Sequence, residues 1–204
     1  MIAALVAVAM LVIVSAALAV HSSGDFEIEG NIIDEAAAGP DWGSVFDANG
    51  NVADIDGGIA AGFLMDDISP AAAVDHTVFT SGGTKNNQQP SDWFWGSQSV
   101  PAKNDLSNVY AFGTVNSGDL VIYAGLERLT PNGDSHIDIE FNATMISLDE
   151  AVPCDNEPCG FLGSKTVGDI LVAMDFTKGG DFGTLRVFRW DGSQYLIVTN
   201  GTIS

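Results

Sequence analysis

The stretch His136-Ile-Asp-Ile-Glu-Phe141 alternates polar and apolar residues without a break. A period of two is the pattern of a half-buried β-strand, because successive side chains of a strand point to opposite faces. Ile137, Ile139 and Phe141 would then lie on the inward face, and His136 and its polar neighbours on the other. The stretch therefore predicts a strand of a sheet that covers a core on one side.

Further strands are expected on both sides of this one. Residues 120–124 and 170–174 are apolar on both faces, which predicts central strands covered on each side. Residues 185–190 and 195–199 follow, and Asp191-Gly-Ser193 between them is a hairpin signal. The remaining turn signals include Asn49-Gly50, Ser117-Gly-Asp119 and Pro131-Asn-Gly-Asp134.

Helices contribute little to the expected fold. No stretch past residue 20 carries a ten-residue helical stripe, and residues 59–65 fit at most one or two helical turns. Strands at roughly even spacing with Gly and Asp turns are typical of a β-sandwich. We predict an all-β fold, an antiparallel β-sandwich of jelly-roll (concanavalin-like) type, formed by residues 20–204 as one domain. The abrupt end after the last strand leaves open that the chain is a piece of a longer protein.

The N-terminus predicts export. Residues 1–20 are apolar except for Ser15, and such a run can span a bilayer as a helix. The run ends in Ala17-Leu-Ala19, the pattern that a signal peptidase cuts. Residues 1–19 are thus a cleaved signal peptide or a retained membrane anchor; no Lys or Arg occurs before Lys85, which counts against the signal. Contact with the membrane is expected only through this segment, if it is uncleaved.

The composition is strongly acidic. There are 27 Asp plus Glu against 7 Lys plus Arg, so the net charge is −20. Such a charge repels phosphate backbones, and a nucleic-acid partner is not expected. Asp is more frequent than Glu, which fits a loop-rich β protein, a Ca²⁺-binding protein or a salt-loving source. These three interpretations remain open.

Cys154 and Cys159 are the two cysteines of the chain. Two thiols are too few for a structural zinc site, and no histidine lies nearby in sequence. In an exported protein, a short loop-closing disulfide between them is the better interpretation.

Trp93 and Trp95 are candidates for ligand binding. In an extended segment the two indoles would point the same way, and two such rings can stack on a sugar. They can equally cover the end of a sandwich, with the indole bodies buried. We expect Trp93 in the core and Trp95 on the surface.

Two polar clusters are candidate contacts for a ligand or a metal. Lys103, Asp105 and Asn108 would either contact a ligand or hold the turn before a strand. A Ca²⁺ site would use the oxygen-bearing side chains of Asp47, Asn49, Asn51 and Asp54. The spacing of an EF-hand is not met, and an Asn-Gly turn accounts for most of this second pattern. A structural Ca²⁺ therefore stays an alternative, and no other cofactor is expected.

Strand 136–141 also resembles the Glu-Ile-Asp-Ile-Glu strand of jelly-roll glycosidases of the laminarinase type. The resemblance places His136 where the nucleophile belongs, and Glu140 matches the acid/base. Imidazole cannot replace the carboxylate that forms the glycosyl ester. We therefore expect no catalytic residues here, and an edge strand with a solvated polar face. An inactive relative of these hydrolases is the alternative.

A wider resemblance covers about residues 26–192. It rests on these strings: Ser91-Asp-Trp93, Val100-Pro-Ala-Lys-Asn-Asp-Leu-Ser-Asn-Val-Tyr-Ala111, Gly118-Asp-Leu120, Tyr123-Ala-Gly-Leu-Glu-Arg128, Asn132-Gly-Asp134 and Gly168-Asp-Ile170. The chain resembles the N-terminal β-sandwich domain of large bacterial, often actinobacterial, surface proteins, in which prealbumin-like or adhesin-type modules often follow. The resemblance implies architecture and location only.

The expected function is that of a secreted or cell-surface module without enzymatic activity. It would be an adhesin-type structural domain or a carbohydrate-binding domain. Its partners would be carbohydrates or other cell-surface proteins.

Overall fold

A computed structural model describes residues 26, 40–55, 58–65, 75–80, 85–149, 159–177 and 181–201. Across these residues the structure consists mainly of antiparallel β-sheets, so the predicted all-β class is confirmed. The two described helices are short: α2 (Trp42–Val45) and the 3₁₀ turn η1 (Pro90–Asp92).

The chain divides into two compact units. One comprises Met1–Gly62 and Ala111–Tyr123, and the other comprises Phe63–Tyr110 and Ala124–Ser204. The expectation of one domain over residues 20–204 stays a prediction. The expected signal or anchor in residues 1–19 lies outside the described residues. Within the described ranges, no helix is long and apolar enough to cross a membrane.

The first unit contains α2 and an aromatic cluster. Asp41 caps α2 with its side chain, and Ser44 completes a capping box by accepting from the backbone N–H of Asp41 at 3.0 Å. The ring of Phe26 stacks on Phe112 and Tyr123, with centroids 5.1 and 4.6 Å apart. These buried rings form the core of this unit.

A three-stranded sheet has the order β1-β4-β5, and its strands belong in part to each unit. The bounds are β1 (Gly58–Met65), β4 (Leu106–Asn116) and β5 (Asp119–Arg128). At Gly58, a Cβ atom would lie 2.3 Å from the ring of Phe112. Only glycine therefore fits this close approach of β1 to the aromatic cluster.

Two sequence-based expectations are wrong in this sheet. Residues 59–65 form strand β1 and not a helical turn. Residues 120–124 lie in β5, which is an outer strand of its sheet and not a central one. Leu120 is 60% exposed and Ile122 is 45% exposed, so this apolar run is covered mainly on one face.

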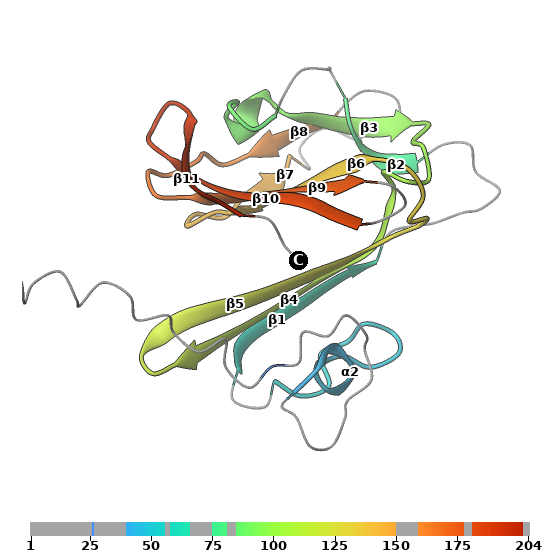
Figure 1. Cartoon of the computed structure of the whole chain (residues 1–204), viewed down its shortest axis with the longest axis vertical. Coiled ribbons are helices and arrows are strands. Elements are labelled where there is room, and N and C mark those ends of the chain that lie inside the picture. The colour runs from blue at the N-terminus through green and yellow to red at the C-terminus, as the bar shows by residue number, and fades with distance from the viewer. Residues whose placement is uncertain are drawn as a thin grey trace, which may run out of the picture. The chain divides into compact units, whose positions relative to one another are not determined.

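The second unit contains two four-stranded sheets, drawn in Figure 1. The first has the order β11-β10-β9-β6, with β6 (Ser135–Phe141), β9 (Ile170–Thr177), β10 (Asp181–Trp190) and β11 (Tyr195–Gly201). The second has the order β2-β3-β8-β7, with β2 (Asp75–Phe79), β3 (Phe94–Gln98), β7 (Ser147–Leu148) and β8 (Cys159–Leu162).

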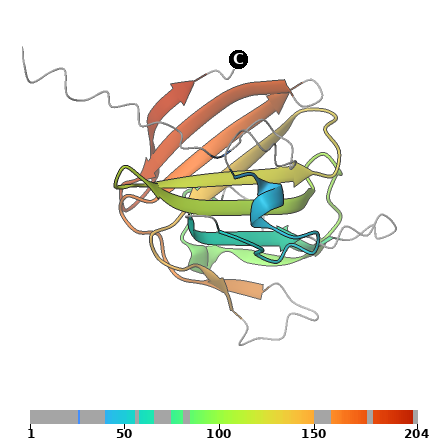
Figure 2. The same ribbon diagram turned by 90° about the horizontal axis from the view of Figure 1, so that it is seen from below.

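The first of these sheets agrees with the sequence pattern. Strand β9 is central and buries Leu171, Ala173 and Phe176. Strands β9, β10 and β11 lie side by side as the orange-to-red arrows of Figure 2. The loop between β10 and β11 is closed by Asp191, whose carboxylate accepts from the backbone N–H of Ser193, so the predicted hairpin is confirmed. These pairings place β6 at the edge, as predicted.

Candidate functional site

The polar face of β6 is the starting point of the candidate site. The register of β6 against β9 sets His136 opposite Asp175, and β9 against β10 brings Arg186 to the same face. Alternation along β6 adds Asp138 and Glu140 to this face. Five ionisable side chains from three strands are therefore gathered on one side of the sheet.

His136 lies between two carboxylates. Its Nδ1 is 2.7 Å from Asp175 and its Nε2 is 2.8 Å from Asp138, while Arg186 donates to the other oxygen of Asp175 at 2.9 Å. Partial burial alone would lower the pKa of His136, but the hydrogen bond to Asp175 and the charges of both carboxylates outweigh it, and the pKa is raised. The hydrogen bond from His136, aided by Arg186, lowers the pKa of Asp175.

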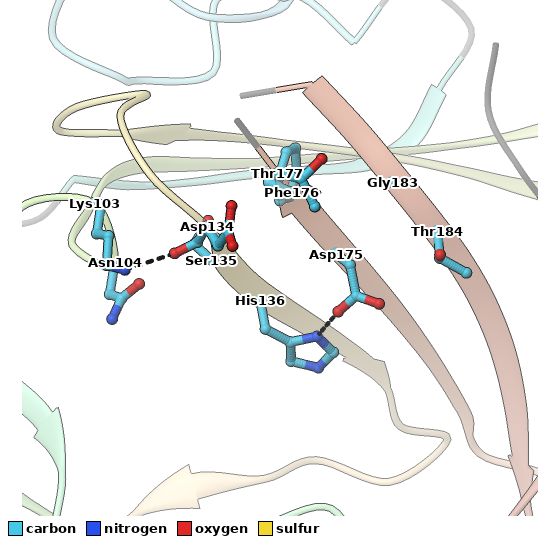
Figure 3. Close-up of a pocket in the computed structure, with 10 residues that line it drawn as sticks. All are labelled: Lys103, Asn104, Asp134, Ser135, His136, Asp175, Phe176, Thr177, Gly183 and Thr184. Atoms are coloured by element: carbon cyan, nitrogen blue, oxygen red, sulfur yellow. Dashed lines mark hydrogen bonds and ion pairs between the residues drawn. The ribbon is translucent and has the colours of Figure 1, made fainter. Parts of the chain in front are cut away.

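An open groove of about 500 Å³ adjoins His136. Figure 3 shows His136 and Asp175 joined in this groove, and Lys103 directed to Asp134. The ammonium of Lys103 donates to the backbone carbonyl of Asp134 at 2.8 Å. The lining of the groove includes an imidazole, two carboxylates and the hydroxyls of Thr177 and Thr184, which are groups that can hydrogen-bond to a polar ligand.

The opposite end of the polar face is closed. Lys165 has a side chain with 0% exposure, and its Nζ lies 2.9 Å from Oε1 of Glu140, which is 13% exposed. The same ammonium donates to the backbone carbonyl of Asn86 at 2.5 Å. Glu140 is thus a buried ion-pair partner and not part of a solvated face.

Three aromatic rings surround the Lys165 ammonium. Its Nζ lies 5.0 Å from the ring centroid of Trp93, 5.1 Å from that of Trp190 and 4.6 Å from that of Tyr195. A cation over an aromatic face is attracted by the ring quadrupole. Burial nevertheless lowers the pKa of Lys165 and raises the pKa of Glu140, against the opposing effect of their mutual attraction. We call Lys165, Glu140 and these three rings the lysine cage.

The expectation of a solvated polar face is therefore wrong for the Glu140 end of β6. The cause is a tertiary contact, because the segment that leads into η1 covers this end of β6. Asn86 donates to Asp138 at 2.8 Å, and Asn87 accepts from the backbone N–H of Tyr195 at 3.0 Å. His136, at the other end of the face, remains 48% exposed.

Sequence reasoning missed Lys165. Its neighbours are residues 86, 93, 140, 190 and 195, and no local pattern links those positions to residue 165. The sequence gives only an indirect signal for this site. Lys165 is one of the few Lys and Arg residues of the chain, and it lies just before the buried strand β9.

Trp93 and Trp95 differ in their surroundings. Trp93 is buried, and its indole N–H donates to the carbonyl of Lys85 at 3.1 Å, so its place in the core is confirmed. Its ring packs edge-on against Phe79 and Phe161, with centroids 5.7 Å away in each case. Trp95, in β3, is partly buried instead of exposed. The two indoles therefore do not form an exposed sugar platform.

The residues of the Lys103, Asp105 and Asn108 cluster have separate partners. The backbone carbonyl of Asp105 accepts from the backbone N–H of Leu129, which joins the residue before β4 to the residue after β5. Asn108 donates to Glu127 on β5 at 2.7 Å. Of the three, only Lys103 lines the groove.

Residues 47–51 form a self-contained turn. The carboxylate of Asp47 accepts from the backbone N–H groups of Asn49 and Asn51 at 2.8 and 2.9 Å, and from the side-chain amide of Asn51. These bonds, led by those from Asn51, lower the pKa of Asp47. Asp54 is exposed. In the part of the chain that the structure describes, no three His, Cys, Asp or Glu side chains are grouped to hold a metal, and Ca²⁺ binding here stays a prediction.

The predicted disulfide falls partly outside the described residues. Cys159 is buried at the start of β8, whereas Cys154 lies in a segment that the structure does not describe. The pairing stays a prediction.

Comparisons of the chain with protein-family models, with curated proteins and with solved structures found no match.

Proposed function

We propose that this chain is an exported, non-enzymatic module of the cell surface, with an adhesin-type structural role. The apolar N-terminus, the acidic composition and the all-β fold support this proposal. The proposal includes a jelly-roll connectivity. In support, the chain visits the two sheets of the second unit alternately: β2 and β3, then β6, then β7 and β8, then β9 to β11.

The lysine cage is the observation that carries the proposal. A retaining glycosidase needs two carboxyls about 5 Å apart, one of which exchanges a proton with the sugar oxygen. Glu140, which matches the acid/base, is instead bound to a fully buried ammonium. Breaking that pair would leave an uncompensated buried charge. The Glu140 carboxylate therefore points into the protein, where it links β6 to the loop before β9.

A hydrolysis assay tests the proposal. We expect no release of reducing sugar from β-glucans by the natural protein, and none by the His136→Glu variant, because Glu140 remains bound to Lys165. The exposed-carboxylate variant Asp119→Asn serves as the matched control for Glu140→Gln. Hydrolysis by the natural protein that is lost in Glu140→Gln but kept in Asp119→Asn would establish an enzyme and contradict the proposal.

Carbohydrate binding without turnover is a second candidate, favoured by the open groove beside His136. If the groove binds sugars, titration calorimetry with an oligosaccharide panel should detect binding that is lost in both His136→Ala and Asp175→Asn. The variant Trp95→Ala should bind normally, because Trp95 does not line the groove. If no heat of binding is detected, the second candidate is contradicted and the structural role remains the proposed function.

A further inference from the structure

We propose that Lys165 and Glu140 condense into an intramolecular amide, which makes the lysine cage the site of a covalent cross-link. The two groups already meet, with Nζ of Lys165 2.9 Å from Oε1 of Glu140. The link would join the loop before β9 to the edge strand β6. This inference does not depend on the proposed function.

Burial in the cage disfavours the charged form of each group. The Lys165 side chain is inaccessible to solvent and Glu140 nearly so. Burial lowers the pKa of the amine and raises the pKa of the acid. Oε2 of Glu140 and the hydroxyl of Tyr195 are also buried. The interaction of this hydroxyl with Glu140 lowers the pKa of the acid, but burial outweighs it. An amide would remove the two charges that this environment disfavours.

The reaction balances with no other reactant. The neutral amine of Lys165 attacks the carboxyl carbon of protonated Glu140, and a bond forms between Nζ and Cδ. A proton passes from Nζ to the departing hydroxyl, the C–O bond breaks, and water leaves. In bulk water, ionisation of the free amine and acid opposes this condensation. The fold holds the amine and the carboxyl next to each other, so they need not meet by diffusion. Well-oriented intramolecular reactions of this kind reach effective molarities of about 10⁵ M or more.

Asp169 is the other carboxylate whose charge acts on Lys165, and it is an unsuitable partner. Its two oxygens accept from the backbone N–H groups of Ala143 and Thr166, at 2.9 and 2.8 Å. These bonds tie the Asp169 carboxylate to the backbone, whereas Glu140 lies in direct contact with Nζ of Lys165. Glu140 is therefore the expected site of the link.

Mass spectrometry of the purified full chain tests the inference. After reduction of cysteines, the intact protein should be lighter by the mass of one water than its sequence requires from its measured N-terminus. Trypsin should fail to cut after Lys165, because its amine is acylated, and should release residues 129–178 as one peptide with an internal cross-link. Fragmentation should place the cross-link between Glu140 and Lys165.

Two variants give matched controls. Lys165→Arg keeps a cation but offers no amine for this condensation, so it should show the full mass. Glu140→Gln should reach the same amide by loss of ammonia if the cage drives the reaction. A natural protein of full mass that is cleaved normally after Lys165 would overturn the inference, whatever the variants do. A cross-link between Lys165 and Asp169 would also overturn it.

Discussion

At the scale of single residues, Trp93 shows how one side chain joins local and tertiary structure. It follows the 3₁₀ turn η1, its N–H is bonded to Lys85, and its ring contacts both the Lys165 ammonium and Phe161 of β8. Trp95, two residues later, lies within β3 opposite Cys159 and is partly buried. The difference in burial predicts a difference in stability.

We expect Trp93→Ala to lower the free energy of unfolding by about 3–5 kcal/mol, as large-to-small changes of buried aromatic residues do. Trp95→Ala is the matched control and should cost less than about 3 kcal/mol, because less of its surface is buried. Urea denaturation followed by circular dichroism measures both. Equal losses for the two variants would mean that Trp93 does not occupy the core.

His136 makes stability depend on pH. Because the pKa of His136 is raised in the folded state, its stabilising contribution is complete below its unfolded pKa of about 6.5 and is lost as the pH rises through the folded value. Its side chain is 48% exposed, so solvent screening should keep the effect below about 1 kcal/mol.

Urea titrations at pH 5.5 and 8.5 test this prediction (both values chosen to lie about a unit or more to either side of the ordinary histidine pKa). The natural protein should lose stability between them relative to His136→Gln, which keeps a polar side chain but does not titrate. A constant difference between the two proteins would contradict the assignment.

The place of Trp93 in the core was predictable, because a large aromatic ring gains from burial whichever side chains surround it, distant ones such as Phe161 included. Lys165 was not, because its partners are as far away in sequence as Asn86. Glu140 was misjudged for the same reason, since alternation along β6 reports which face it occupies and not what covers that face.

At the scale of elements, alternation and turn chemistry predicted β6, β9, β10 and β11. Strand β1 was missed because its sequence, Gly58-Ile-Ala-Ala-Gly-Phe-Leu-Met65, is rich in small residues that give neither period clearly. Strand β5 was expected to be central because Leu120 and Ile122 are apolar. Sheet order depends on distant pairing, which an apolar run does not encode.

The β4–β5 turn gives a prediction at this scale. Ser117 and Gly118 have φ values of 53° and 93°, and positive φ at both central residues is the requirement of a type I′ hairpin turn. A Cβ atom at Gly118 would meet nothing within 4 Å, so only backbone strain opposes a side chain there. Gly118→Ala should therefore destabilise the protein by about 1–2 kcal/mol.

Gly62 provides the control for this turn. A Cβ atom at Gly62 also meets nothing within 4 Å, but the φ of Gly62 is not positive. Gly62→Ala should be neutral or stabilise by up to about 1 kcal/mol. Thermal unfolding of the two variants distinguishes the effect of backbone strain from the effect of the added methyl group. A Gly118→Ala variant as stable as the natural protein would show that the turn has another conformation.

At the scale of the whole molecule, the net charge and the apolar N-terminal run are the features on which the proposed export and surface location rest. A net charge of −20 repels nucleic acid and anionic lipid surfaces. The expectation about partners follows from composition alone, and it stays a prediction. Composition says nothing of which chain segment covers a sheet, so it could not lead to the lysine cage.

Export gives the last prediction. Signal peptidase recognises small residues before the cut, and Ala17-Leu-Ala19 supplies them at the end of an apolar run. Expression in a secreting host should yield a protein in the medium whose N-terminus, by mass spectrometry, is Val20. Ala19→Arg places a large charged residue at the cut and should hold the chain in the membrane fraction with Met1 intact, whereas Ser15→Ala should be processed normally. An intact Met1 in the membrane-bound natural protein would identify residues 1–19 as an anchor, and the domain would then act tethered to the cell that makes it.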